Sequence, residues 1–371
     1  MEYLLFGVAV FLAFGNGAND NFKGFATVWG SQSLGYRKAL LLATLATAAG
    51  SVLSLVLAQG LVQQFSGKGL LPQGMVEAPS FLISVGLGAA LTVIIATRAG
   101  LPISTTHALI GGLVGAGLAA SPGQLQLAKL GNTFLLPLLL SPLLAAGLGL
   151  LVYKLLRLRP ANADCACITV EMPTGAVTAS AATTMPGMQL AATPRLVIAS
   201  ASDCNQPGSL EASARIRLSI PRLLDRLHVF SASLICFARA VNDTPKLAAL
   251  LVASHFMSAQ MSLVTMAATM ALGGLLLSRR VAQTMSQRVC SMDQAQGLAA
   301  NLITAALVLT ASQFALPVST THVSVGAIAG IGAAGDTLNR AALRTILLSW
   351  LATLPMAGCL AWLAFTLMEQ F

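Results

Sequence analysis

The sequence reads LPISTTH at residues 101–107 and LPVSTTH at residues 316–322, which lie 215 positions apart. A second pair consists of FGNGANDNFK at residues 14–23 and FARAVNDTPK at residues 237–246, which lie 223 positions apart. Chance matches of this length, in the same order in both halves, are improbable. The chain therefore contains an internal duplication, and these two pairs of motifs decide its fold.

The composition around these motifs is that of a membrane protein. Of 371 residues, 56% are hydrophobic and only 9% are charged, and the mean hydropathy is +0.79. A soluble domain carries roughly a quarter charged residues. This excludes an ordinary soluble enzyme, a disordered protein and a nucleic-acid binder, despite the isoelectric point near 9.7. The 33 Gly and 15 Pro favour broken membrane helices that line a cavity.

Apolar runs of spanning length, about 20 residues, form two groups of five. They lie at 3–34, 39–62, 79–97, 101–120, 132–156, 227–252, 257–278, 295–315, 316–334 and 343–368. We predict a first repeat at 1–159, a cytoplasmic connector at 160–225 and a second repeat at 226–371. The connector is rich in Ala, Ser, Thr and Pro, and its alternating runs at 168–172 and 196–200 predict either a few strands or a flexible linker.

The basic residues predict the orientation. With the N-terminus outside and ten crossings, 16 of the 21 Lys and Arg fall inside, and Lys68 and Lys129 fall outside. The other three, Lys23, Arg239 and Lys246, lie in or beside the motifs. We therefore expect a multi-pass protein of the cell (inner) membrane with extracytoplasmic termini. Five crossings per half would invert the second repeat, as in secondary transporters. Re-entrant hairpins at the Ser-Thr-Thr segments would change this parity.

Two acidic residues, Asp20 and Asp243, lie within predicted spans, each three positions before a lysine. A charge at the centre of a membrane helix costs roughly 2.5–3.5 kcal/mol. These groups form either structural ion pairs or a polar ligand site at depth. Gly15–Gly17 predicts an unwound point before Asp20, with close helix packing as the alternative, and Pro245 predicts a break in the second copy.

The Ser-Thr-Thr motifs are typical of helix starts. Pro102 and Pro317 suit the first turn of a helix, where hydroxyls and free N–H groups hold an anion. Simple N-capping by Ser or Thr is the alternative. We interpret His107 and His322 as structural rather than as a proton relay. Lysines and helix starts suit a tetrahedral oxyanion, and a carboxylate favours phosphate, which keeps a proton, over sulfate, which does not.

These residues resemble the inorganic phosphate transporter (PiT) family, on Gly17–Asp20, Val241–Asp243 and the twin Ser-Thr-Thr-His motifs. The resemblance covers both halves outside 160–222. It implies phosphate uptake coupled to Na⁺ or H⁺, extracellular termini, and phosphate and cation sites formed by the motif residues. The family's site residues carry over onto Asn19, Asp20, Ser104, Thr105, Thr106, Asn242, Asp243, Ser319, Thr320 and Thr321. Together with Lys23 and Lys246, whose charge suits an oxyanion, they form the predicted substrate-binding set, and Asp20 and Asp243 are also expected to couple the cation.

The chain departs from the family pattern at two positions. Sodium-coupled relatives commonly have Asn three residues after the motif Asp, whereas this chain has Lys23 and Lys246. Our hypothesis is that these lysines act as built-in cations and weaken or remove the dependence on sodium. The alternative is that they point away from the site and that sodium binds as usual.

The sequence thus predicts an all-α polytopic membrane protein with two inverted repeats of about five segments and broken helices. We expect a symporter that imports inorganic phosphate by alternating access, with no cofactor and no resident metal. Its expected partners are phosphate, membrane lipid and, as an open question, a second copy in a homodimer. A sulfate permease of the same fold is the main alternative; an anion channel and a membrane-embedded hydrolase are further ones. The Cys165, Cys167 and Cys204 set is a weak zinc or redox signal, and ordinary cytoplasmic cysteines are the favoured interpretation.

Overall fold

The computed structural model describes residues 1–156, 165–171, 193–199, 214–255, 257–287, 289 and 292–370. The chain divides into a large helical unit, Met1–Lys154 with His228–Phe371, and a small unit, Leu155–Leu227. Both pairs of duplicated motifs lie in the helical unit.

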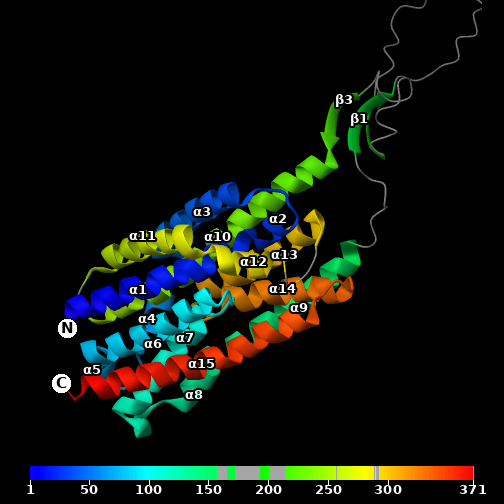
Figure 1. The fold of residues 1–371 in the computed structure, drawn as a ribbon. Coiled ribbons are helices and arrows are strands. Elements are labelled where there is room, and N and C mark those ends of the chain that lie inside the picture. Colours follow the sequence, from blue (N-terminus) through cyan, green and yellow to red (C-terminus); the bar gives the residue numbers. More distant parts are fainter. Residues whose placement is uncertain are drawn as a thin grey trace, which may run out of the picture. The chain divides into compact units, whose positions relative to one another are not determined.

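The helical unit is built from two successive sets of helices (Figure 1). The first set comprises α1 (Glu2–Asp20), η1 (Lys23–Phe25), α2 (Ala26–Gly30), α3 (Tyr36–Leu57), α4 (Gln59–Phe65), α5 (Gln73–Val76), α6 (Pro79–Arg98), α7 (Thr105–Ala120), η2 (Pro122–Gln124), α8 (Leu127–Lys129), η3 (Leu130–Leu135) and α9 (Leu136–Leu156). The second set comprises α10 (Ile220–Ala253), α11 (Ala259–Leu277), α12 (Arg279–Gln287), α13 (Gln294–Gln313), α14 (Thr320–Ala334) and α15 (Arg340–Met368).

Several of these helices have the length and composition of membrane spans. Among the described residues, six helical stretches qualify: Tyr36–Leu57, Pro79–Arg98, Leu127–Leu155, Ala259–Leu277, Gln294–Gln313 and Arg340–Met368. Helices α7 and α14 are apolar but have only 16 and 15 residues. At 1.5 Å per residue they reach about 24 and 23 Å, short of the roughly 30 Å hydrocarbon core. Each is preceded by a non-helical segment that ends at the serine of the Ser-Thr-Thr motif, and the two threonines begin the helix.

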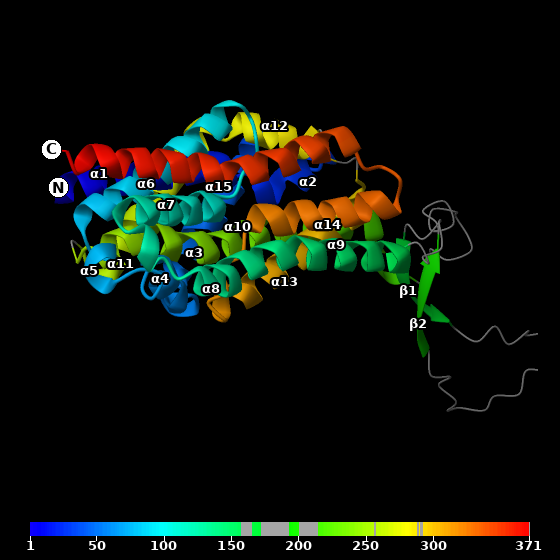
Figure 2. The same ribbon diagram turned by 90° about the horizontal axis from the view of Figure 1, so that it is seen from below.

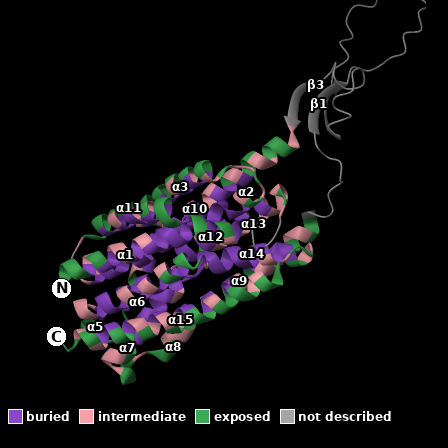
Figure 3. Ribbon diagram, viewed as in Figure 1, coloured by how far each residue is buried: buried purple, intermediate pink, exposed green. Residues whose placement is uncertain are grey.

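The outer surface of the helical unit is apolar. Large side chains on the outside of α3, α9 and α11 are widely exposed, for example Val56 (79%), Leu139 (67%) and Leu276 (69%). Figure 3 shows buried residues in the centre of the unit and exposed ones along its outer helices. An apolar exterior over helices of this length is the surface that lipid tails cover.

Two glycines show that the duplication extends to the packing of the helices. A Cβ at Gly50 in α3 would collide with the carbonyl oxygen of Phe237 in α10. A Cβ at Gly273 in α11 would collide with the carbonyl oxygen of Phe14 in α1. Both glycines and both partners are related by the offset of 223 that relates the Asn-Asp motifs. Small residues here allow α3 against α10, and α11 against α1, to approach backbone to backbone.

The two Asn-Asp motifs have different backbones. The first is broken as predicted, but the break follows Asp20, where α1 ends, and not Gly15–Gly17, which is helical. The next residue, Asn21, keeps helical dihedral angles, and its side chain bonds Thr44 and Thr47 of α3. The predicted break at Pro245 is wrong: Pro245 lies inside α10, a continuous helix of 34 residues. Proline removes one backbone donor, and a membrane helix held by its neighbours tolerates this loss.

The small unit contains a three-stranded antiparallel sheet. Its strands are β1 (Cys165–Glu171), β2 (Thr193–Ala199) and β3 (Ala214–Ser219), in the order β2-β1-β3. The predicted alternating runs overlap β1 and β2, so strands form here, and the all-α description applies to the helical unit. Cys204 lies outside the described residues, so the interpretation of the three cysteines stays a prediction.

Both termini lie at one end of the helical unit in two perpendicular views (Figures 1 and 2). Helix α9, which leads into the connector, ends at the opposite end of this unit. The first half of the chain therefore begins at one end of the helical unit and ends, with α9, at the opposite end.

Candidate functional site

Helices α7 and α14 meet with their N-terminal ends. The Thr106 hydroxyl donates to the Val318 carbonyl at 3.2 Å, and the Thr321 hydroxyl donates to the Ile103 carbonyl at 2.9 Å. From this meeting point the two helices run in opposite directions (Figure 2). The N-terminal end of a helix carries partial positive charge and free N–H groups. Two such ends facing one another create a strongly anion-attracting point inside the helical unit.

The serines at these helix starts cap the helices, whereas one threonine hydroxyl has no partner in the described residues. Ser104 accepts from the His107 N–H at 3.1 Å, and Ser319 accepts from the His322 N–H at 3.3 Å. Both serines are thus N-caps. The Thr320 hydroxyl is buried and has no hydrogen-bond partner among the described residues. An unpaired buried hydroxyl at a helix start is available to an anion.

Charged side chains surround this meeting point. In the described part of the chain, five charged residues are buried: Asp20, Lys23, Arg239, Asp243 and Lys246. They come from α1, η1 and α10. Three cations and two carboxylates give the cluster a formal charge of +1. A buried cluster of this kind is stable only when each charge is paired or hydrogen-bonded.

Lys23 occupies a cage of three oxygen atoms. Its ammonium donates to the Asp20 carboxylate, to the Ile103 carbonyl at 2.8 Å and to the Thr321 hydroxyl at 2.6 Å. The carboxylate and the carbonyl belong to the first half of the chain, whereas Thr321 belongs to the second. We call this set the first cage.

Lys246 occupies an equivalent cage. Its ammonium donates to the Val318 carbonyl at 2.8 Å and to the Thr106 hydroxyl at 2.9 Å, and lies 3.7 Å from the Asp243 carboxylate. Here the carboxylate and the carbonyl belong to the second half, and Thr106 belongs to the first. We call this set the second cage.

Arg239 is a member of the cluster that the sequence analysis did not single out. Its guanidinium donates to Asn16 at 3.1 Å and to Thr47 at 2.9 Å, and lies 3.7 Å from Asp243. Its Nε has no partner among the described residues, although the side chain is fully buried. The signal was present in the sequence, because an arginine inside a predicted span is rare, and the offset of 223 pairs Arg239 with Asn16.

Asn19 and Asn242 hold the segments that lead into α7 and α14. Asn19 donates to Thr97 at 2.9 Å and to the Leu101 carbonyl at 3.0 Å. Asn242 donates to the Val318 carbonyl at 3.3 Å and accepts from Ser312 at 3.2 Å. Their amides are largely used within the protein. The contacts thus position the Ser-Thr-Thr segments.

The two motif histidines lie side by side behind the helix starts. Their ring centroids are 4.4 Å apart, and His322 stacks on Trp350 of α15 at 3.7 Å. Trp350 also donates to the Pro102 carbonyl at 3.1 Å. The stack therefore packs both motif segments against α15, which fits the structural interpretation of the histidines.

The predicted site residues lie together, and all are buried. They are Asn19, Asp20, Lys23, Ser104, Thr105, Thr106, Asn242, Asp243, Lys246, Ser319, Thr320 and Thr321. Asn16 links several of them, since its amide donates to Thr105 at 2.9 Å and to Asp20 and Asp243 at 3.3 Å each. The structure places these residues in one cluster; their binding of a substrate stays a prediction.

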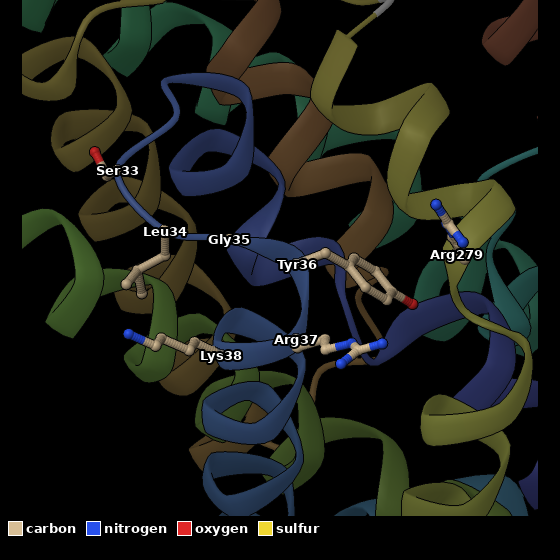
Figure 4. Close-up of a pocket in the computed structure, with 7 residues that line it drawn as sticks. All are labelled: Ser33, Leu34, Gly35, Tyr36, Arg37, Lys38 and Arg279. Carbon is tan, nitrogen blue, oxygen red and sulfur yellow. The ribbon is translucent and has the colours of Figure 1, made fainter.

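A separate pocket of about 660 Å³ lies on the surface where α2 is followed by α3. Its lining includes Arg37, Lys38 and Arg279, and the Arg279 guanidinium lies over the Tyr36 ring (Figure 4). A neighbouring pocket includes Arg98 and Arg280 and shares Arg279. These basic residues are distinct from the buried cluster and form a positively charged part of the surface.

Comparison with known proteins gives matches over almost the whole chain. The model of the phosphate transporter family matches residues 16–361. The inorganic phosphate transporter 2-1, chloroplastic, of Arabidopsis thaliana is 27% identical over 425 residues, covering 96% of this chain and 70% of the relative. A protein named as a predicted phosphate permease in Haemophilus influenzae is 26% identical over 410 residues, covering 96% and 93%.

A solved structure has the same fold. The sodium-dependent phosphate transporter superimposes with a TM-score of 0.78 at 20% sequence identity, and the match covers 100% of this chain and 99% of that one. At this identity the likeness establishes the arrangement of helices alone.

Proposed function

This chain belongs to the phosphate transporter family, a family of membrane transporters and not of enzymes, and we propose that it imports inorganic phosphate by secondary active transport. The substrate would bind where α7 and α14 meet. The import direction, the residues that bind phosphate and the mechanism of alternating access are parts of this proposal.

The observation that carries the proposal is the meeting of two helix N-termini beside three buried cations. The Thr320 hydroxyl and the Arg239 Nε are donors without protein partners in the described residues. The first N–H groups of a helix also have no partner within that helix. A tetrahedral oxyanion offers several acceptors to such donors. The formal charge of the cluster, +1, would be neutralised by one monovalent phosphate.

The two carboxylates support phosphate over sulfate. Phosphate at neutral pH keeps at least one proton, so it can donate a hydrogen bond to Asp20 or Asp243. Sulfate cannot, and its oxygen atoms would face a buried carboxylate across an unfavourable contact. We therefore propose phosphate as the substrate, with sulfate as the alternative that the experiment must test.

The proposed topology has two inverted repeats of five segments, at 1–159 and 226–371, joined by a cytoplasmic connector at 160–225. Two observations support it. Both termini lie at the same end of the helical unit, and basic residues gather around two pockets at the surface where α3 begins and α6 ends. Under the positive-inside rule that surface is cytoplasmic and the termini are extracytoplasmic. A homodimer stays a prediction.

The test is uptake of labelled phosphate into proteoliposomes that contain the purified chain, under imposed sodium or proton gradients. We expect concentrative uptake that excess unlabelled phosphate abolishes and excess sulfate leaves nearly unchanged. Liposomes without protein give the background. Uptake of sulfate in place of phosphate would contradict the proposed substrate, and equilibration without accumulation would contradict secondary active transport.

A further inference from the structure

We infer that Lys23 and Lys246 are tethered cations that permanently fill two alkali-cation sites, so that this transporter moves phosphate without sodium. The inference rests on the proposed function, because it specifies how the same site is electrically balanced. It also extends the hypothesis drawn from the sequence, because the structure shows which oxygen atoms each lysine contacts.

The two cages are chemically the same. Each consists of a motif carboxylate, the main-chain carbonyl immediately before a Ser-Thr-Thr motif and a threonine hydroxyl from the other half. In each cage the hydroxyl also donates to the same carbonyl, at 2.9 Å in the first and 3.2 Å in the second. Two cages built alike, at equivalent positions of a duplicated chain, indicate two equivalent ion-binding sites.

The ligands of both cages are oxygen atoms, the donors that hard cations such as alkali and alkaline-earth ions prefer. A lysine ammonium has the same single charge as Na⁺ and three N–H donors, one for each oxygen of a cage. The side chains of both lysines are almost completely buried, at 1% and 2% exposed. An ammonium desolvated in this way keeps its oxygen partners, because leaving them would strand a charge inside the protein.

The charges of the cluster explain what the lysines replace. With both ammonium groups the cluster has a formal charge of +1, which suits an anion. Without them, Arg239 and the two carboxylates would leave −1, and an anion would be repelled unless mobile cations entered the cages. A chain with neutral residues at 23 and 246 would therefore need cations to bind phosphate, whereas this chain provides them itself.

The first experiment measures phosphate uptake in proteoliposomes with Na⁺ or with choline as the external cation, under the same proton gradient. For the unmodified chain we expect rates within about twofold of each other. The double variant K23N/K246N removes both charges, leaves room in the cages and adds an amide oxygen to each. We expect its uptake to rise at least about tenfold when Na⁺ replaces choline, with saturation at high Na⁺.

Two further variants serve as controls. K23M/K246M removes the charges but fills the cages with apolar atoms, so we expect little uptake with either cation. K38N removes an exposed lysine of α3 outside the cages, and we expect it to behave as the unmodified chain. A loss of at least tenfold in the unmodified chain on replacing Na⁺ by choline would overturn the inference while leaving phosphate transport intact.

A binding measurement separates this inference from the proposed function. In detergent, adding Na⁺ in place of choline should leave the melting temperature of the unmodified chain within about 1 °C, because both cages are filled. The K23N/K246N variant should gain several degrees. A clear rise in the unmodified chain, or none in a folded variant, would contradict tethered cations even if no phosphate were transported. Absence of phosphate uptake with every cation would instead contradict the proposed function.

Discussion

The two Asn-Asp motifs share a phenylalanine, the Asn-Asp pair and a lysine at equivalent positions, but they have different backbones. In the first, α1 ends at Asp20, and Lys23 begins a short 3₁₀ helix. In the second, α10 passes without interruption through Asp243 and Lys246. Position 21 is an asparagine whose side chain bonds two threonines of α3. The equivalent residue, Thr244, bonds Ser51 of α3 at 2.8 Å. Both side chains therefore bond α3, although only the first helix ends here.

This difference changes how the two carboxylates are held. The broken backbone brings Lys23 into direct contact with Asp20. Along the continuous helix, Lys246 and Arg239 both lie 3.7 Å from Asp243, which has its closest donors in Asn242 at 3.1 Å and Asn16 at 3.3 Å. Asn16 donates to both carboxylates at 3.3 Å, so the difference is that Asp20 is in direct contact with a lysine, while the cations near Asp243 lie 3.7 Å away. We expect Asp243 to be the carboxylate that accepts a hydrogen bond from the protonated phosphate.

The largest expected effect is from neutralising these carboxylates. Asp20→Asn and Asp243→Asn each leave a buried cation without its charge partner, which costs about 3–5 kcal/mol. We expect each variant to insert in the membrane but to lose phosphate uptake by at least about 100-fold. Initial rates in proteoliposomes, with Asp336→Asn at an exposed turn as the control, measure this effect. Normal uptake by either variant would remove that carboxylate from the mechanism.

An intermediate effect is expected at Arg239, whose counterpart in the first motif is the neutral Asn16. Arg239→Gln removes charged hydrogen bonds worth about 1.5–3 kcal/mol, so we expect KM for phosphate to rise roughly 10–100-fold. Arg239→Lys keeps the charge but loses the planar fork, and we expect a smaller rise. The exposed Arg344→Gln is the control. Equal KM values for the Gln variant and the unmodified chain would assign Arg239 to packing alone.

The smallest expected effect is at Pro245. Because α10 is already continuous there, Pro245→Ala adds a backbone donor without changing the path of the helix. We expect uptake within about twofold of the unmodified chain and a melting temperature that is equal or slightly higher. A tenfold loss of uptake at an unchanged melting temperature would show instead that α10 must break at Pro245 in another state of the transport cycle.

The sequence predicted much of the fold and of the site for a physical reason. Apolar runs of spanning length have few alternatives to a membrane helix, so the ten predicted runs each correspond to helices in the structure. Buried Asp and Lys residues are too costly to be scattered, so the motifs that contain them lie in one cluster. The predicted fold and the gathering of the Asn-Asp and Ser-Thr-Thr residues follow from these two costs.

Features that depend on contacts between distant segments could not be predicted in the same way. Asn21, which follows the break, bonds Thr44 and Thr47 of another helix, a contact that no local pattern reveals. The continuity of α10 through Pro245 depends on the neighbours that support it. Arg239 could have been assigned to the cluster only by assuming that residues related by the offset of 223, such as Asn16 and Arg239, are in contact. Local sequence contains the elements, whereas tertiary contacts decide which of two possible backbones forms.

The exchange of threonines between the cages has a consequence for biosynthesis. Lys23 is synthesised almost 300 residues before Thr321, its partner in the first cage. While the first half emerges from the ribosome, Lys23 has only the carboxylate and the carbonyl of its own half as partners. Thr106 does not yet have its hydrogen-bond donor, because Lys246 is still to be synthesised. Neither half can complete its own cage, so the charged segment of the first set of helices is stabilised fully only after the second set has been inserted. We therefore expect the two halves, when expressed as separate fragments, to be stable only when both are present.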